Sequence, residues 1–443
     1  MSTPVTTTVS YIEETLLTYA DAVKRGDYDT HVGNLIGKHD NVRSYWEDQL
    51  TRLTIRPYLT DLVARKRAAE QKVRIVDLGC GAGQGYELLT RIDQPDLDLG
   101  LYHQRVLETN DLACYLGIDI SESMVNHGNE LYAANPAMHF VQGDLNDGLA
   151  AVADEKPFDL YFCAYGSLSH LETTSLQSLL NDVVMHAADG SIVVMDLLGR
   201  NSLEWPDYWI VENDADKYRD YSMSYLHRDV YNRVPEAVEI EHFPMRFWTG
   251  DEIDELVQGV NRQHRGGLHN GSHANGESSL NVLQKFDRSI FVSRHIDTKE
   301  YNSNLKPIRR VVNQLHQDYM RTDLEQLLWE PGQIPMHSDP RVNNFFQQLM
   351  TSWNRVIQFT QARLHGNISL VHTTEWDTLP GPLQFALMTM DRVINNAEWM
   401  WFGDPRANII EPQLGYTLRS LERNLQRGLG CGHGFLVILE VST

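Results

Sequence analysis

Short apolar runs alternate with helix-sized segments between residues 73 and 198 of this chain. Five such runs stand out in the sequence: VRIVDLG (73–79), YLGIDI (115–120), MHFVQGD (138–144), FDLYFCA (158–164) and SIVVMDLL (191–198). Runs of this length, separated by segments long enough for a crossover helix, predict a parallel sheet with helices on both faces. The pattern therefore predicts an α/β fold.

The flanking regions follow a helical spacing of apolar positions instead. Residues 8–25 and 41–70 predict N-terminal helices. RFWTGDEIDELVQGV (246–260) predicts a helix that begins with a capping box, in which Thr249 is the N-cap and Glu252 lies three residues later. Residues 279–297 predict one or two closing strands. The C-terminal part predicts further helices near 305–329, 341–365, 382–401 and 413–428.

The last apolar run, HGFLVILEV (433–441), predicts a strand. This strand either adds an edge to the sheet or belongs to a small separate domain. A length of 443 residues suggests two or three structural units. We expect an N-terminal helical cap over 1–72, a sheet domain over 73–298 with a lid inserted at 199–250, and a mainly helical domain over 299–443.

Composition and charge narrow the classes of partner. The chain has 38 basic and 60 acidic residues, a net charge of −22, which disfavours nucleic acids and anionic membranes. No uninterrupted apolar run approaches the roughly 20 residues that span a bilayer. The N-terminal sequence lacks the basic and apolar regions of a secretory signal, and the four cysteines lack CxxC spacing. We expect a cytoplasmic protein with reduced thiols.

The motif with the most chemical content follows the first predicted strand. Asp77-Leu-Gly79-Cys-Gly81-Ala-Gly83 places three glycines where a strand gives way to a helix, so that the backbone can turn tightly and approach a ligand. The dinucleotide pattern GxGxxG fails, because a third glycine would fall on Gln84 or Tyr86. A phosphate-binding P-loop fails as well, since no Gly-Lys-Ser/Thr follows.

DLGCGAG resembles the first motif of class I S-adenosylmethionine-dependent methyltransferases, and the next strands agree. GIDIS, QGDL and AYGSLSHLE follow the second, third and fourth strands in order. The resemblance covers residues 73–198 well and 199–297 loosely, and it implies a Rossmann-like sheet with S-adenosylmethionine as cofactor. It implies that Asp119 binds the ribose hydroxyls, that Asp144 accepts from the adenine amine, and that Asp77 lies near the ammonium. The implied cofactor-binding set is Asp77, Gly79, Gly81, Gly83, Asp119, Ile120, Asp144, Leu145 and Ala164.

One spacing departs from ordinary nucleotide-binding units. Gly83 and Asp119 are 36 positions apart, whereas roughly 20 residues separate the glycine motif from the acidic residue in such units. The excess, residues 91–113, either extends the first helix or inserts a loop. This insertion leaves the pairing of Asp119 with the ribose open.

The candidate catalytic residues are His170 and Tyr165, which follow the fourth strand. Methyl transfer is an in-line displacement, so positioning supplies much of the rate and a base is needed only for a protonated acceptor. His170 is either that base or a residue that shapes the pocket. Tyr165 either caps the methyl group or the substrate, or packs.

Aromatic residues mark the candidate substrate region. Seven lie within residues 205–231 of the expected lid, and rings with polar tips suit an aromatic or cationic small molecule. The alternative is that they only seal the lid. The substrate candidates are Trp46, Trp205, Tyr208 and Trp209. His264, His269 and His273 lie in a glycine-rich stretch without ligand spacing, so we expect no metal site.

These patterns predict S-adenosylmethionine-dependent methyl transfer to an oxygen, nitrogen or carbon atom of a small molecule, by in-line displacement in a closed pocket. Two alternatives stay open: a protein methyltransferase that docks its substrate through the C-terminal domain, and a non-catalytic cofactor-binding or assembly module. The C-terminal region contains five of the nine tryptophans, which argues for a core or an interface. Assembly of a homo-oligomer through this region is a further expectation.

Overall fold

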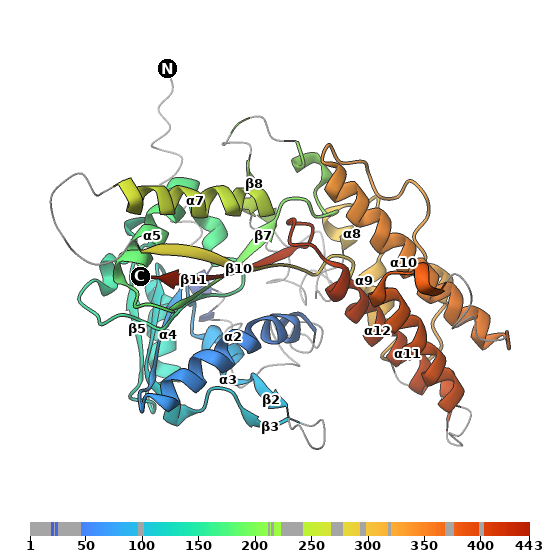
Figure 1. Cartoon of the computed structure of the whole chain (residues 1–443), viewed down its shortest axis with the longest axis horizontal. Helices are drawn as coiled ribbons and strands as arrows, with labels where there is room; N and C mark the ends of the chain where they lie inside the picture. Colours follow the sequence, from blue (N-terminus) through green and yellow to red (C-terminus); the bar gives the residue numbers. More distant parts are fainter. Residues whose placement is uncertain are drawn as a thin grey trace. The chain divides into compact units, whose positions relative to one another are not determined.

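The structure is a computed structural model of the whole chain (Figure 1). It describes residues 19–21, 23–24, 46–95, 102–210, 213, 217–222, 242–266, 278–292, 298–317, 320–367, 376–397 and 403–443. The chain divides into two compact units. Unit 1 contains Met1–Leu198, Glu212–Phe286 and Gly434–Thr443, and unit 2 contains Gly199–Val211 and Asp287–His433.

Unit 1 is built on a mixed sheet in which the strand order is β10-β11-β7-β6-β1-β4-β5, with β8 and β9 joined beside β7. Its strands are β1 (Val73–Leu78), β4 (Leu112–Asp119), β5 (Met138–Gln142), β6 (Leu160–Cys163), β7 (Ile192–Gly199), β8 (Tyr218–Ser222), β9 (His242–Trp248), β10 (Ser279–Arg288) and β11 (Gly434–Ser442). β1, β4, β5, β6 and β7 pair in parallel. The predicted parallel α/β sheet is therefore confirmed, with each of the five apolar runs in a strand.

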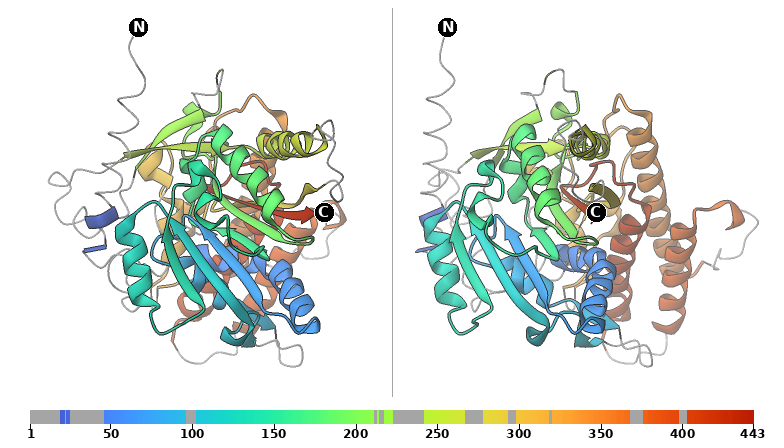
Figure 2. Two further views of the ribbon diagram at one scale, coloured as in Figure 1. Left: turned by 90° about the vertical axis from the view of Figure 1, so that its left-hand side faces the viewer. Right: turned by 60° about the vertical axis from the view of Figure 1, so that its left-hand side comes forward.

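Alternate side chains of the strands face two helical layers, as expected for strands buried on both sides. Val193, Met195 and Leu197 of β7 share one apolar cluster with α5 (Thr173–His186) and α7 (Gly250–Gly266). Ile192 and Val194 face the opposite cluster, which includes α2 (Asp48–Ala68) and α3 (Gln84–Thr90). Figure 1 shows α5 and α7 on one side of the sheet and α2 and α3 on the other, and Figure 2 shows the twist of the strands.

The C-terminal strand β11 lies inside this sheet, between β7 and β10. It pairs antiparallel with β7, from Gly434 opposite Leu198 to Glu440 opposite Ile192. Of the two alternatives for this run, the sheet is therefore correct, although the strand is internal and not at an edge. The expected domain boundary at residue 299 differs from the observed division, because unit 2 consists of the segment after β7 together with the residues between the end of β10 and β11.

The insertion before Asp119 forms a small hairpin. β2 (Asp93–Pro95) and β3 (Tyr102–Arg105) pair antiparallel, and β4 follows directly after a short turn. The first helix, α3, ends at Thr90 and is not extended. Because the extra residues close on themselves, β4 still ends at Asp119 beside β1.

The predicted capping box of α7 is confirmed. Glu252 N donates to Thr249 Oγ1 at 3.3 Å, and Thr249 N donates to Glu252 Oε2 at 2.9 Å. The expected helix over 246–260 begins later than its pattern suggested, since residues 246–248 are the end of β9. This capping pair fixes where the strand ends and the helix starts.

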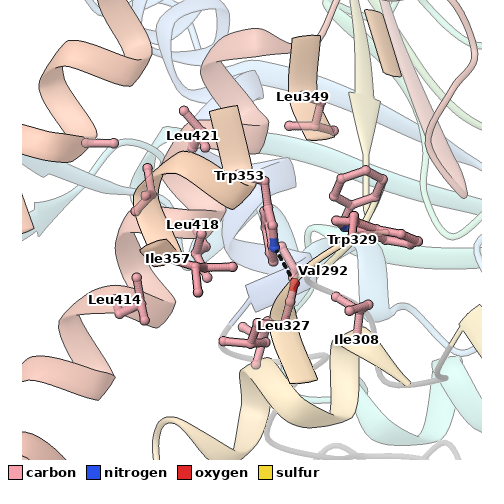
Figure 3. Close-up of a cluster of buried hydrophobic side chains, with 14 of the residues drawn as sticks. Val292, Ile308, Leu327, Trp329, Leu349, Trp353, Ile357, Leu414, Leu418 and Leu421 are labelled. Atoms are coloured by element: carbon pink, nitrogen blue, oxygen red, sulfur yellow. Dashed lines mark hydrogen bonds between the residues drawn. The ribbon is translucent and has the colours of Figure 1, made fainter. Parts of the chain in front are cut away.

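Unit 2 is mainly helical, as predicted. Its longer helices are α9 (Ile308–Gln314), α10 (Pro340–Leu364), α11 (Gly381–Ala397) and α12 (Glu411–Leu425), with the short α8 (Thr298–Tyr301) before them. The single helix expected over 305–329 is instead α9 followed by a 3-10 turn at Leu324–Leu327. Trp329 and Trp353 lie in the buried core, where Trp353 Nε1 donates to the Leu327 carbonyl at 2.9 Å (Figure 3).

A search of the described helices finds none that is both long and apolar enough to cross a membrane.

Candidate cofactor and active site

The glycine loop after β1 adopts backbone angles that favour glycine. The φ angles of Gly79, Gly81 and Gly83 are +74°, +53° and +96°. A Cβ on Gly79 would lie 2.6 Å from Ser167 Cβ, which is closer than real side chains approach. The loop therefore needs residues without side chains at these positions, and its approach to a ligand stays a prediction.

Asp119 at the end of β4 is joined to this loop. Its Oδ2 accepts from Gly81 N at 2.8 Å and its Oδ1 accepts from Ser121 N at 2.9 Å. Burial raises the pKa of Asp119, and the two backbone donors partly oppose that effect. The hairpin insertion thus leaves Asp119 next to the glycine loop, and the pairing of Asp119 with the ribose stays a prediction.

Asp77 is a buried carboxylate near the end of β1. It is 1% exposed, and the Tyr115 hydroxyl donates a hydrogen bond to its Oδ2. Burial raises the pKa of Asp77 to about 7, and the Tyr115 bond lowers it in part. A Cβ on Gly85 would fall 2.2 Å from the same oxygen. Asp77 is therefore enclosed by Tyr115 and by the start of α3, and its place near the ammonium stays a prediction.

Asp144 follows β5 and caps a short 3-10 turn. Its Oδ1 accepts from the backbone N and from the side-chain Nδ2 of Asn146, both at 2.9 Å. Leu145 and Ala164 are buried, whereas Ile120 is half-buried. These residues lie at the carboxyl ends of β4, β5 and β6, the edge at which open α/β sheets bind ligands.

The loop between β6 and α5 carries both catalytic candidates. Tyr165 has a φ of +59°, unusual for a residue with a side chain, and its N donates to Asp196 Oδ2 at 2.9 Å. Ser167 Oγ donates to the Gly79 carbonyl at 2.9 Å, so the loop is tied to the glycine loop. The cofactor motif and the catalytic candidates thus form one connected site.

His170 is exposed to solvent, yet desolvation by the surrounding protein lowers its pKa to about 4. Its ring centroid lies 6.1 Å from that of Phe243 on β9. His170 is therefore neutral at pH 7 and lies against an aromatic side chain that the sequence had not singled out.

Tyr19 is a second residue that sequence reasoning missed. It packs with Ala82 of the glycine loop and Met124 of α4 (Glu122–Leu131), and its ring centroid lies 6.0 Å from that of Phe243. Burial, followed by the charge of Asp119, raises its pKa. The sequence predicted only that the segment around Tyr19 is helical. The contact of Tyr19 with a loop more than 60 positions away depends on the tertiary fold.

The aromatic residues of the expected lid do not all belong to the unit that contains the cofactor motif. Trp205 and Trp209 belong to unit 2 and are buried there, with indole nitrogens that donate to the carbonyls of Gly199 and Ser202. We correct their assignment from lid to core, because both rings pack inside unit 2. Tyr208 is half-buried in the same segment, and Trp46 is half-buried just before α2. For these two, a substrate role stays a prediction.

Two groups of predicted residues lie outside the described part of the chain. Residues 223–241 of the expected lid form one group, and His269 and His273 form the other. His264 lies in α7. Among the described residues, no group of three or more histidine, cysteine, aspartate or glutamate side chains is arranged to hold a metal ion.

The site fits the chemistry of S-adenosylmethionine. The glycine loop leaves space for the amino acid part and carries no lysine for a phosphate, which the cofactor lacks. The carboxylates of Asp119 and Asp144 can accept hydrogen bonds from ribose hydroxyls and from an adenine amine.

Comparison with known proteins agrees with this fit. Residues 100–190 match the family model of a methyltransferase domain. No curated protein matches the chain.

Among solved structures, the chain is similar to the DhpI–SAM–HEP complex, with 14% identity, coverage of 62% of this chain and 92% of that one, and a TM-score of 0.33. It is also similar to the CcbJ methyltransferase from Streptomyces caelestis, with 16% identity, coverage of 52% and 80%, and a TM-score of 0.31. An S-adenosylmethionine-dependent methyltransferase from Clostridium acetobutylicum shares 14% identity over 52% and 83% of the chains, with a TM-score of 0.30. The methyltransferase-domain match thus covers a part of unit 1 that runs from β3 to α5 and that contains Asp119, Asp144 and His170.

Proposed function

We propose that this methyltransferase acts on a small-molecule acceptor, at an oxygen, nitrogen or carbon atom, by in-line displacement in a closed pocket. When bound, the cofactor supplies a methyl group that its sulfonium already activates. The residues of the chain need only exclude water, orient the acceptor and, for a protonated acceptor, receive a proton.

The observation that carries this proposal is a row of neighbouring aromatic side chains beside the cofactor motif. Tyr19, Phe243 and His170 come from three distant parts of the chain, and their successive ring centroids are 6.0 Å and 6.1 Å apart. Tyr19 also packs on the glycine loop. Rings gathered beside the glycine loop favour a small acceptor over a folded protein surface, since small-molecule sites are lined mostly by apolar and aromatic side chains.

His170 can serve as base or as wall of this pocket. A pKa of about 4 leaves the imidazole neutral at pH 7, so it can accept a proton from a protonated acceptor. The same low pKa makes it a weak base, which favours pocket shaping. An acceptor that arrives deprotonated needs no base at all.

The distribution of charge disfavours a polyanionic acceptor. Of the 38 basic and 60 acidic residues, unit 2 contains 16 and 17, which leaves 22 and 43 in unit 1. The net charges are therefore −1 and −21, so the negative charge belongs to the unit that contains the cofactor motif. A nucleic acid would meet repulsion there.

Measuring cofactor binding tests the assignment of Asp119 to the cofactor site. Asp119→Ala should weaken S-adenosylmethionine binding at least about tenfold, roughly the 1.4 kcal/mol expected when charge-assisted hydrogen bonds are lost. Isothermal titration calorimetry measures this. His170→Ala is the matched control in the same site, and it should bind the cofactor as the unaltered chain does. Equal affinity of the Asp119 variant would remove Asp119 from the ribose site.

Label transfer tests the acceptor class. The protein with methyl-labelled cofactor is offered two fractions of one extract, ultrafiltered small molecules and desalted proteins. Label in the small-molecule fraction supports the proposal. Label only in proteins would favour the protein-acceptor alternative, and binding without transfer to either would favour a non-catalytic module.

A further inference from the structure

Tyr165 adopts a backbone conformation that its side chain opposes. Its φ is +59°, and the next residue, Gly166, is also left-handed at +79°. A glycine takes this conformation readily, as Gly166 does, whereas a residue with a Cβ is strained in it. Such strain persists only where the surrounding structure holds the residue in place, and it gathers at functional sites.

The group that holds Tyr165 is a buried carboxylate on the neighbouring strand. Asp196 of β7 is 1% exposed, and its Oδ2 accepts from Tyr165 N at 2.9 Å. A carboxylate in an apolar strand is costly to bury, so its hydrogen bonds must compensate. The Tyr165 amide supplies one such hydrogen bond.

Two serine hydroxyls fasten the rest of the same loop. Ser167 Oγ donates to the Gly79 carbonyl at 2.9 Å, and Ser169 Oγ accepts from Leu198 N at 3.0 Å. The loop between β6 and α5 is thus tied to the cofactor loop on one side and to β7 on the other. Of these three ties, only the one from Asp196 acts on the strained residue.

We propose that Asp196 is a positioning residue for methyl transfer: it holds Tyr165 in the left-handed conformation and so fixes the loop that presents Tyr165 and His170 to the acceptor. This inference rests on the proposed function, because it assigns Asp196 to the acceptor side of that same site. Asp196 itself need touch neither the cofactor nor the acceptor.

The first test separates positioning from cofactor binding. Asp196→Ala should lower kcat by at least about tenfold, as small misplacements of reacting groups do, while the Kd for S-adenosylmethionine changes less than about twofold. Asp196→Asn keeps an acceptor oxygen at the same place and should recover most of kcat. A folded Asp196→Ala variant with unchanged kcat would overturn the proposal, and so would an equal loss of cofactor affinity.

The second test needs no acceptor and therefore separates failure of this inference from failure of the proposed function. Tyr165→Gly should unfold at higher urea than Tyr165→Ala, because only alanine retains a Cβ in the left-handed conformation. In an Asp196→Ala background, which lacks the acceptor of the Tyr165 N–H, this difference should shrink. An undiminished difference would show that Asp196 does not hold the conformation, whatever the chain methylates.

Discussion

Buried carboxylates at the strand ends set the electrostatics of the site at the scale of single residues. Asp119 accepts two backbone N–H groups, whereas Asp77 accepts the Tyr115 hydroxyl in a more enclosed position. Both residues were implied by the resemblance of DLGCGAG and GIDIS to the motifs of class I methyltransferases. The sequence did not predict that Asp77 would be enclosed, because burial depends on α3 packing over the strand.

Asp77 should make stability fall as pH rises. Its pKa is about 7 in the folded chain and near 4 in an unfolded one. The folded state therefore binds the extra proton, and its stabilising effect is complete below about pH 4 and lost as pH rises through 7. The unfolding temperatures of Asp77→Asn and of the unaltered chain are compared without cofactor. As the pH rises across this range, the difference between them should shift in favour of the variant.

Tyr115→Phe is the matched control for that prediction. Loss of the hydroxyl removes the hydrogen bond that lowers the pKa of Asp77, so the decline in stability should extend to higher pH. A gap between Asp77→Asn and the unaltered chain that does not change between pH 4 and 8 would contradict the raised pKa.

At the scale of elements, the sequence predicted whether a segment is a helix or a strand better than it predicted where that element begins and ends. The capping pair of Thr249 and Glu252 fixed the start of α7, because a cap is a local interaction. The insertion at 91–113 gave no such signal, and it formed a hairpin where a longer helix or a loop was expected. The pairing of β2 with β3 depends on residues several positions apart, which spacing alone does not reveal.

The segment after β10 is held by a side chain instead of a neighbouring strand. Glu422 of α12 is buried and accepts from the backbone nitrogens of Ile290, Phe291 and Val292 at 3.0, 2.6 and 3.0 Å. Burial raises the pKa of Glu422 to about 7, with these donors opposing the effect. One carboxylate thus satisfies three N–H groups of a buried, apolar stretch of unit 2.

Loss of this carboxylate should loosen that segment first. Glu422→Ala leaves three buried donors without their acceptor, at about 1–3 kcal/mol each, so peptides covering 290–292 should exchange amide hydrogen at least about tenfold faster. Glu422→Gln keeps one oxygen and should show a smaller effect. Equal exchange in all three proteins, measured by mass spectrometry, would contradict the role of Glu422.

At the scale of the whole molecule, the cofactor unit depends on the end of the chain. β11 lies between β7 and β10, and its apolar side chains are almost fully buried. These side chains are Phe435, Leu436, Val437, Ile438, Leu439 and Val441. Each contributes roughly 1.5–3 kcal/mol on burial, and their total is comparable to the roughly 5–15 kcal/mol net stability of a domain.

Removal of residues 434–443 should therefore abolish cofactor binding, although every cofactor motif lies before residue 199. Calorimetry and circular dichroism on the truncated chain measure this. A chain that lacks only Thr443, which is outside β11, is the control and should bind normally. Normal binding by the longer truncation would show that β11 is dispensable.

The sequence by itself determined the parallel sheet, the glycine loop and the acidic residues at the strand ends. Each is encoded locally, in the periodicity of one strand or in the turn that follows it. The tertiary structure decided what depends on distant contacts: the place of β11 inside the sheet, the core role of Trp205 and Trp209, and the approach of Tyr19 to the glycine loop. The physical reason is that apolar pattern reports how far a residue is buried, and only the folded chain settles which surface buries it.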